Sequence, residues 1–168
     1  DFSRALRSLM RQDPDIILVG ETRDRETAQT AMEAALTGHM VFTTLHANDT
    51  ATAITRLAEM GCPPYLVGSS VIGVMAQRLI RKVCLKCCKT VKADPNKHAS
   101  YIKHGIKEFN VAKVIDFKNT NINSDSVCKF CNGTGYKGRL GIYEVMRVND
   151  SIRELIMKSS TADVIREY

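Results

Sequence analysis

Cysteines are the residues of this sequence with the clearest chemical consequence. Four of the six form two C-x-x-C pairs separated by forty residues: Cys84 with Cys87, and Cys128 with Cys131. Each pair can span one edge of a tetrahedron, and four thiolates fill the shell of a structural zinc ion, leaving no open position for water. Because no secretory signal opens the sequence, this spacing favours a metal over disulfides. The two pairs therefore predict a zinc-stabilised subdomain.

The identity of the metal and the roles of the other two cysteines, Cys62 and Cys88, stay open. An iron–sulfur cluster also uses four cysteines, and Cys88 could compete as a ligand because it directly follows Cys87. Cys62 follows a glycine far from both pairs, and we expect it to be a packed free thiol.

A carboxylate and a histidine form the second chemical grouping. Glu21 follows the apolar run 16–19 and Gly20, and His46 follows the apolar run 40–45. If the two runs are parallel neighbouring strands, both side chains lie at the carboxyl edge of the sheet, where α/β proteins bind ligands. The first segment resembles a Walker B motif, in which a rigidly held carboxylate orients the water that attacks a nucleotide phosphate.

The hydrophobic pattern predicts a scaffold for these residues. An apolar run rich in isoleucine and valine is typical of a strand buried on both faces, as in a parallel sheet. A strand, a helix and a second strand at this spacing form a βαβ unit. The expected elements are a helix over 5–10, a strand over 16–19, a helix from Asp24 to Gly38, a strand over 40–45, a helix from Asp49 or Thr50 to Met60, and a helix over about 64–79.

The second half of the sequence differs in kind. Residues 88–127 are rich in lysine and asparagine, and we expect a helix over 97–109, a strand over 111–117 and an exposed loop over 119–126. The tail 152–168 has a helical pattern. The predicted domains are residues 1–83, a tetracysteine zinc-binding subdomain over 84–147, and a C-terminal helical segment over 148–168.

Composition and charge exclude several classes of protein. With 44% hydrophobic and 25% charged residues, the chain is an ordinary globular one. The apolar stretch 65–76 is shorter than the ~20 residues of a membrane span and predicts a buried helix. Residues 1–83 carry no net charge and residues 84–168 carry all of the +6. A zinc ion bound by four thiolates would reduce this to +4, a weak bias, so we expect no specific nucleic acid partner.

Longer segments around these motifs carry a family resemblance. The stretches 6–15, 19–24, 36–49 and 76–79 resemble the bacterial secretion ATPases, and most closely the type IV pilus assembly ATPases and general secretion pathway protein E of type II secretion. The similarity covers residues 2–90 and resumes over 128–148. It implies the C-terminal half of a RecA-like P-loop NTPase domain, an α/β fold, with a small zinc-binding subdomain.

The resemblance also implies an activity, partners and site residues. It implies a cytoplasmic homo-hexamer, peripheral to the inner membrane, that hydrolyses ATP with Mg²⁺ and drives a pilus or pseudopilus through an inner-membrane platform protein. Glu21 and His46 match catalytic positions, His39 joins His46 in the family's histidine box, and Gly20, His39 and Thr44 match the nucleotide-binding edge. Gly20 stands where most Walker B motifs have aspartate, as is normal in this family, and Thr22 replaces a large apolar residue.

Several alternatives stay open. The 168 residues contain no G-x-x-x-x-G-K-[ST] phosphate loop, so we expect a fragment of a longer protein that is inactive alone. Residues 131–135 also resemble the zinc repeats of heat-shock protein 40 chaperones, which would make the chain a non-catalytic protein-binding module. A DNA-handling RecA relative is the second alternative. The residues do not separate pilus extension, protein secretion and DNA uptake.

Overall fold

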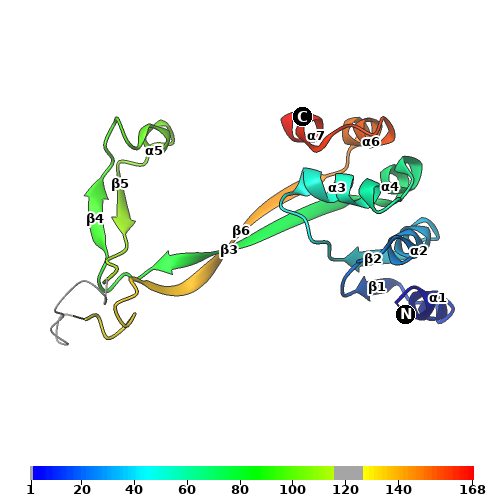
Figure 1. The fold of residues 1–168 in the computed structure, drawn as a ribbon, viewed down its shortest axis with the longest axis horizontal. Coiled ribbons are helices and arrows are strands. Elements are labelled where there is room, and N and C mark those ends of the chain that lie inside the picture. The colour runs from blue at the N-terminus through cyan, green and yellow to red at the C-terminus, as the bar shows by residue number, and fades with distance from the viewer. Residues whose placement is uncertain (1, 116–126) are drawn as a thin grey trace. The chain divides into compact units, whose positions relative to one another are not determined.

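The fold consists of two compact units (Figure 1). The computed structural model describes residues 2–115 and 127–168. Residues 1–77 and 143–168 form the first unit, which we call the parallel-sheet unit, and residues 78–142 form the second, which we call the cysteine unit.

A strand–helix–strand motif organises the start of the parallel-sheet unit. Strands β1 (Ile16–Val19) and β2 (Met40–Thr43) are joined by helix α2 (Arg25–Leu36). The Asp24 side chain caps α2 by accepting a hydrogen bond from the Thr27 backbone N–H at 2.8 Å. The strands pair in parallel with Ile16 opposite Met40 and Val19 opposite Thr43. The predicted βαβ unit is therefore confirmed.

One feature of this sheet differs from the prediction. Ile17 and Val19 are buried against Leu6 of α1 (Phe2–Met10) and against α2, but Leu18 is 75% exposed and Ile16 65%. The expectation that β1 is buried on both faces is therefore wrong for this chain. The reason is that α1 and α2 pack on one face of a two-stranded sheet, and nothing in the described residues covers the other.

Four helices, packed with Ala28 and Met32 of α2, form most of the main core of this unit. They are α3 (Thr50–Glu59), α4 (Pro64–Ser70), α6 (Asp150–Met157) and α7 (Ala162–Glu167). The C-terminal helices pack on the earlier ones, α6 on α4 and α7 on α3, and bury Val67, Ile152, Ile156 and Ile165. The helical tail is thus confirmed as two helices. Within the described ranges, every helix is too short or too polar to cross a membrane.

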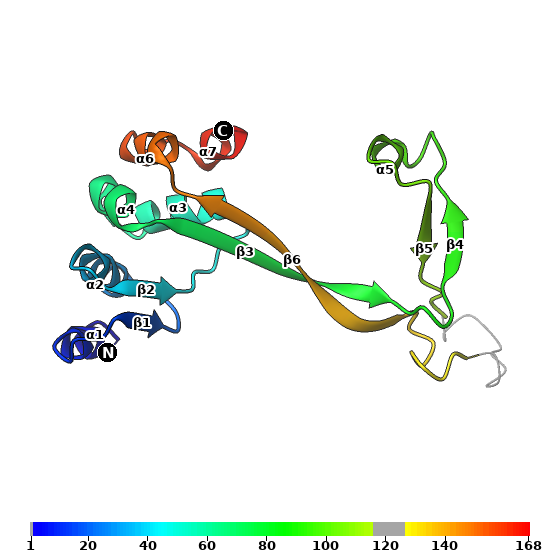
Figure 2. The same cartoon turned by 180° about the vertical axis from the view of Figure 1, so that it is seen from behind.

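The apolar segment after α4 corrects a second prediction. The helix expected over 64–79 ends at Ser70, and strand β3 (Gly73–Val83) follows and pairs with β6 (Tyr136–Arg147). Figures 1 and 2 show these two strands side by side with opposite directions. Ile72 and Met75 are exposed, so the stretch 65–76 is not a buried helix. Gly73 and its β-branched neighbours disfavour a helix and favour the strand.

The cysteine unit contains a small antiparallel hairpin. Strands β4 (Lys89–Lys92) and β5 (Glu108–Val111) pair with Lys89 opposite Val111, and α5 (Ala99–Lys103) lies between them in sequence. The helix expected over 97–109 is much shorter because Gly105, at φ +76°, breaks it. The strand expected over 111–117 instead begins at Glu108 and ends at Val111. The loop expected over 119–126 lies outside the described residues.

Candidate catalytic site and candidate metal centre

Glu21 and His46 meet at the carboxyl edge of the parallel sheet. Glu21 lies just after β1, and His46 lies in the loop between β2 and α3. Because the strands are parallel, both loops leave the sheet at the same edge. The Nε2 atom of His46 lies 2.6 Å from Oε1 of Glu21. The structure thus brings together the two residues that the sequence proposed as catalytic.

Arg23 holds the other oxygen of the Glu21 carboxylate. Its Nε donates a hydrogen bond to Oε2 at 2.6 Å, and its Nη2 lies 2.5 Å from the same atom. The hydrogen bond from Arg23 and the charges of Arg23 and His46 lower the pKa of Glu21, against a smaller opposing effect of burial. Glu21 is therefore held ionised. Arg23 was not among the residues predicted from the sequence, although residues i and i+2 of an extended segment share a side and could have signalled the pair.

The Oε1 atom of Glu21 differs from the other polar atoms described at this edge in its hydrogen bonding. It is buried, and among the described residues it accepts no well-aligned hydrogen bond, although Nε2 of His46 lies 2.6 Å away. Buried polar atoms in folded proteins nearly always have a partner, and an exception calls for a functional explanation. An ionised oxygen in this state suits a ligand that donates a hydrogen bond, such as a water molecule.

Gly20, Thr22 and Thr44 tie the two strand ends together. The Thr44 hydroxyl donates to the Gly20 carbonyl at 2.7 Å, and the Thr22 backbone N–H donates to the Thr44 carbonyl at 3.0 Å. The Thr22 hydroxyl lies 2.7 Å from that of Thr43, so the buried threonine at this position has a polar partner. These bonds extend the strand pairing by one residue and fix the backbone from which Glu21 projects.

His39 lies elsewhere. It directly precedes β2, at the amino end of the strand, whereas Glu21 and His46 lie at the carboxyl edge. Its Nδ1 is 3.0 Å from the Ala34 carbonyl and 3.2 Å from the Thr37 hydroxyl, so the ring interacts with the last turn of α2. Within this chain the structure does not bring His39 to Glu21, and its part in nucleotide binding stays a prediction.

Contacts distant in sequence anchor the end of the His46 loop at the start of α3. Asp49 caps α3 by accepting from the Thr52 backbone N–H at 2.7 Å, and Arg166 of α7 donates to Asp49 at 3.0 Å. Both contacts lower the pKa of Asp49, the Thr52 N–H most. Glu144 of β6 accepts hydrogen bonds from the backbone N–H and the hydroxyl of Thr50. No local sequence signal predicts these pairs, which join residues 94 and 117 positions apart.

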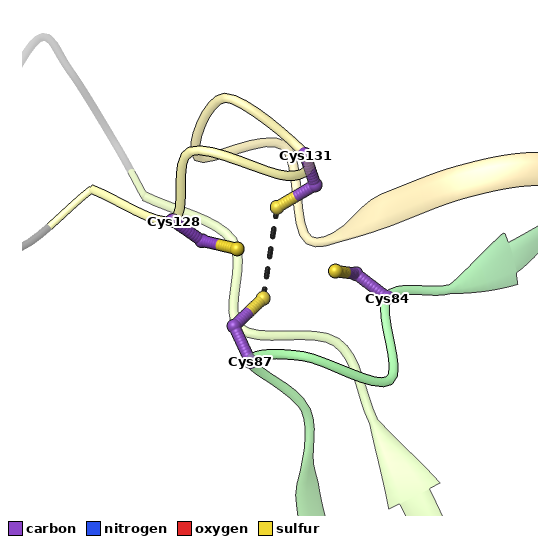
Figure 3. A group of neighbouring side chains, drawn as sticks. All are labelled: Cys84, Cys87, Cys128 and Cys131. Atoms are coloured by element: carbon purple, nitrogen blue, oxygen red, sulfur yellow. Dashed lines mark hydrogen bonds between the residues drawn. The ribbon is translucent and has the colours of Figure 1, made fainter.

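The four paired cysteines form the second site (Figure 3). Their side chains point toward one another from two separate loops, and all four sulfur atoms lie within 4.8 Å of one another. The Sγ atoms of Cys87 and Cys131 are 3.6 Å apart. A zinc ion with Zn–S bonds of about 2.3 Å places tetrahedral sulfurs about 3.8 Å apart. The donor set therefore fits one tetrahedral ion.

The other two cysteines do not belong to this cluster. Cys88 is half-buried and lies outside the group of four that the structure brings together in its described residues. Cys62 is 2% exposed in the core of the parallel-sheet unit, and burial raises the pKa of its thiol. The prediction that Cys62 is a packed free thiol is confirmed.

Backbone turns and a glycine shape the loops that carry the four cysteines. The backbone N–H groups of Cys87 and Cys88 donate to the Cys84 carbonyl, and the Cys84 N–H donates to Gly135. Gly135 has φ +73°, and a Cβ there would approach the Lys113 carbonyl oxygen to 2.9 Å, so only glycine fits. Burial and the neighbouring thiols raise the pKa of Cys87 to about 12. Burial acts upward on Cys131 too, but the Gly135 N–H and the other thiols outweigh it and lower that pKa to about 7.

Comparisons with known proteins agree with the resemblance. The family described as Type II/IV secretion system protein matches residues 1–168. The chain is 48% identical over 166 residues to the type IV pilus assembly ATPase PilB of Thermus thermophilus, covering 99% of this chain and 18% of PilB. It is 44% identical over 170 residues to the type II secretion system ATPase E of Vibrio cholerae, covering 99% of this chain and 31% of that protein.

A solved structure gives the same result for the fold. The crystal structure of the pilus retraction motor PilT with bound ADP matches with a TM-score of 0.62 and 26% identity, covering 99% of this chain and 35% of PilT. The α/β architecture is thus that of an ATPase domain, and the chain spans under a third of the length of the two curated relatives. From this full-length match we conclude that the chain belongs to the family of type II/IV secretion system proteins.

Proposed function

We propose that this chain is part of an ATP-hydrolysing motor that powers type IV pilus assembly or type II protein secretion. The family membership and the names of the relatives support the motor class. The single observation that carries the catalytic assignment is the ionised Glu21 carboxylate at a strand end, with a buried Oε1 that accepts no hydrogen bond among the described residues.

The geometry divides the work between the two oxygens of Glu21. Arg23 occupies Oε2 and keeps the carboxylate ionised and oriented, which leaves Oε1 to accept a hydrogen bond from the water that attacks the terminal phosphate. The Nε2 atom of His46 lies 2.6 Å from Oε1, at the same edge of the sheet. Gly20 and Thr44 fix the strand ends beside the nucleotide, and His39 contributes to nucleotide binding. ATP brings Mg²⁺, which prefers oxygen ligands and water.

The cysteine cluster has a different part in this proposal. Cys84, Cys87, Cys128 and Cys131 hold one structural Zn²⁺, supported by four sulfurs within 4.8 Å of one another. A multi-iron cluster distributes its thiolates over several metal atoms and needs sulfurs farther apart, so the spacing favours a single ion. When bound, zinc supplies no catalysis at such a closed site and stabilises the zinc-binding subdomain that we place at residues 84–147.

The whole motor extends beyond these residues. We propose a homo-hexamer on the cytoplasmic side of the inner membrane, in contact with the membrane platform protein of a pilus or secretion system. The 168 residues by themselves bind no ATP phosphates because they contain no phosphate loop. Tests of activity therefore use the longer protein.

The substitution Glu21→Gln tests the proposed activity. It keeps the size of the side chain but removes the charge, so we expect ATP turnover to fall by about 10²–10⁴-fold with ATP binding retained. Glu59→Gln is the matched control, because Glu59 is an exposed glutamate of α3 paired with Arg56, and it should leave turnover unchanged. Turnover within twofold of normal in Glu21→Gln would refute the assignment and favour a non-catalytic zinc module.

A further inference from the structure

Charge is distributed very unevenly between the two units. Residues 78–142 carry fourteen lysines and arginines against four aspartates and glutamates, a formal net charge of +10. The parallel-sheet unit carries ten against fourteen, a net charge of −4. From the sequence we expect only a weak bias, with +6 in the second half before zinc binds. This expectation underestimates the contrast mainly because Arg78, Arg81 and Lys82 precede residue 84 but belong to the cysteine unit, while the segment 143–168, with a net charge of −1, belongs to the other unit.

The described lysines of the cysteine unit take no part in ion pairs. The eight ion pairs found in the described ranges each join two residues of the parallel-sheet unit, and none of them includes a lysine of the cysteine unit. All ten lysines that the structure describes in the cysteine unit are exposed. Even four thiolates around one zinc ion would leave this unit at about +8. Such a surface attracts an anionic partner.

Exposed apolar side chains accompany these lysines at the cysteine loops. Leu85 is 76% exposed and lies between Cys84 and Lys86, and Phe130 is 52% exposed and follows Lys129. Lys137 lies over the Phe130 ring with Nζ 5.6 Å from its centroid. Each C-x-x-C loop therefore presents one large apolar residue and one lysine, and both loops are joined at the same sulfur cluster.

We propose that the cysteine unit binds the surface of an anionic phospholipid bilayer. Leu85 and Phe130 enter the interfacial region, while the surrounding lysines lie at the level of the headgroup phosphates. This combination of exposed apolar side chains and basic residues is the one that interfacial membrane binding requires. The proposal does not depend on ATP hydrolysis at Glu21.

Two other anionic partners fit the observations less well. Single-stranded nucleic acid needs aromatic rings on which bases stack, but Leu85 is aliphatic, and Tyr101 is packed against His98 and Phe109 within the unit. A second copy of the chain would offer the parallel-sheet unit, whose net charge is only −4. Seven of its fourteen acids already form ion pairs in the described ranges: Glu21, Glu26, Asp49, Glu59, Asp150, Glu154 and Asp163. An anionic bilayer uses both the charge and the apolar residues.

Sedimentation of the zinc-loaded 168-residue chain with vesicles tests the proposal. The chain should bind vesicles of phosphatidylcholine with about 30% phosphatidylglycerol and bind pure phosphatidylcholine at least about tenfold more weakly. Binding should weaken steeply as NaCl rises from about 0.05 to about 0.5 M. The pair Lys86→Gln and Lys129→Gln should lower the partition coefficient by about 25-fold, at about fivefold for each charge.

The apolar residues have a matched control. Leu85→Ser with Phe130→Ser should lower binding by about tenfold, whereas Leu18→Ser should not change it, although Leu18 is as exposed in the parallel-sheet unit as Leu85 is in the cysteine unit. Retained zinc content shows that the cysteine unit of each variant is folded, and an unchanged unfolding temperature shows the same for the parallel-sheet unit of Leu18→Ser. Equal binding to both kinds of vesicle, or an equal effect of Leu18→Ser, would overturn the proposal. So would tight binding of DNA or salt-sensitive self-association without vesicle binding.

Discussion

The two units of this chain are stabilised by different means. The parallel-sheet unit buries a core of apolar side chains from α2, α3, α4, α6 and α7, and a second cluster formed by α1, α2 and β1 adds to it. In the described part of the cysteine unit, Cys84 and Cys131 are the only buried hydrophobic residues. A unit of this size without an apolar core needs a cross-link to be stable, and four converging thiolates provide one when they bind a metal.

The two sites differ in the same way. At the carboxyl edge of the sheet, a folded scaffold holds Glu21 with one oxygen free of hydrogen bonds from the described residues, ready to act on a ligand. At the cysteine cluster, all four donors face one point and leave nothing open for a substrate. The site at Glu21 therefore depends on a unit that folds around its own apolar core, whereas the fold of the cysteine unit depends on its metal site. Each of the following changes should destabilise one unit and leave the other unchanged.

Loss of the metal should produce the largest effect. Cys131→Ser or a strong chelator should unfold the cysteine unit, because structural zinc supplies roughly 10–16 kcal/mol at neutral pH. Hydrogen exchange should then show fast exchange in residues 78–142 and unchanged protection in α3, α4 and α6. Cys88→Ser is the matched control and should keep one zinc ion per chain. Equal loss of protection in both units would contradict independent stabilisation.

A core substitution should have the opposite pattern. Ile152 is 4% exposed and packs in the core of the parallel-sheet unit. Ile152→Ala should lower the free energy of unfolding of that unit by about 2–5 kcal/mol, the usual cost of the lost contacts and the cavity. Urea unfolding measures the change, and metal analysis should still find one zinc ion per chain. Val164→Ala, at an exposed position of α7, should change stability by less than about 0.5 kcal/mol.

The cap of α3 should give the smallest of these effects, with a pH signature. Asp49→Ala removes the cap and should cost about 1 kcal/mol at neutral pH. The pKa of Asp49 is lowered in the folded state, so its contribution is present above the ordinary aspartate value near 4 and is lost as the pH falls below it. Urea unfolding at pH 7 and at about pH 2 should therefore show the variant's deficit shrinking in acid.

The control for the cap shares its arginine partner. Asp163 also pairs with Arg166 but is mostly exposed and caps no helix through its side chain. Asp163→Ala should change stability by less than about 0.5 kcal/mol. A deficit of Asp49→Ala that stayed constant from pH 7 to strongly acidic conditions would contradict the role assigned to the ionised carboxylate.

Local patterns predicted the first half of the parallel-sheet unit well. Apolar runs located β1 and β2, and Asp24 and Asp49 marked the starts of α2 and α3, because caps and strand periodicity act between neighbouring residues. The prediction failed at 64–79, where an apolar run contains the end of a helix and the start of an exposed strand. Composition alone does not distinguish the two, because glycine occurs both within α4, at Gly68, and at the start of β3, at Gly73.

In the candidate sites too, residues with local signals were predicted more readily than residues brought in by distant contacts. The four cysteines were evident from their spacing, and Glu21 with His46 followed from the parallel topology. Arg23 was missed although it is local, and the anchors Glu144 and Arg166 depend on the return of the C-terminal segment to α3. The charge of the cysteine unit was underestimated because a sequence boundary at residue 84 assigns Arg78, Arg81 and Lys82 to the other unit.

Turnover in the longer protein carrying Glu21→Gln, measured together with its zinc content and unfolding temperature, tests the central claim most directly. The claim is that the chemistry lies at the sheet edge, whereas the cysteine cluster maintains structure. We predict one zinc ion per chain, an unfolding temperature within about 2 °C of normal and loss of ATP hydrolysis. Hydrolysis that persisted, or that disappeared only together with the zinc and the folded state, would contradict the account.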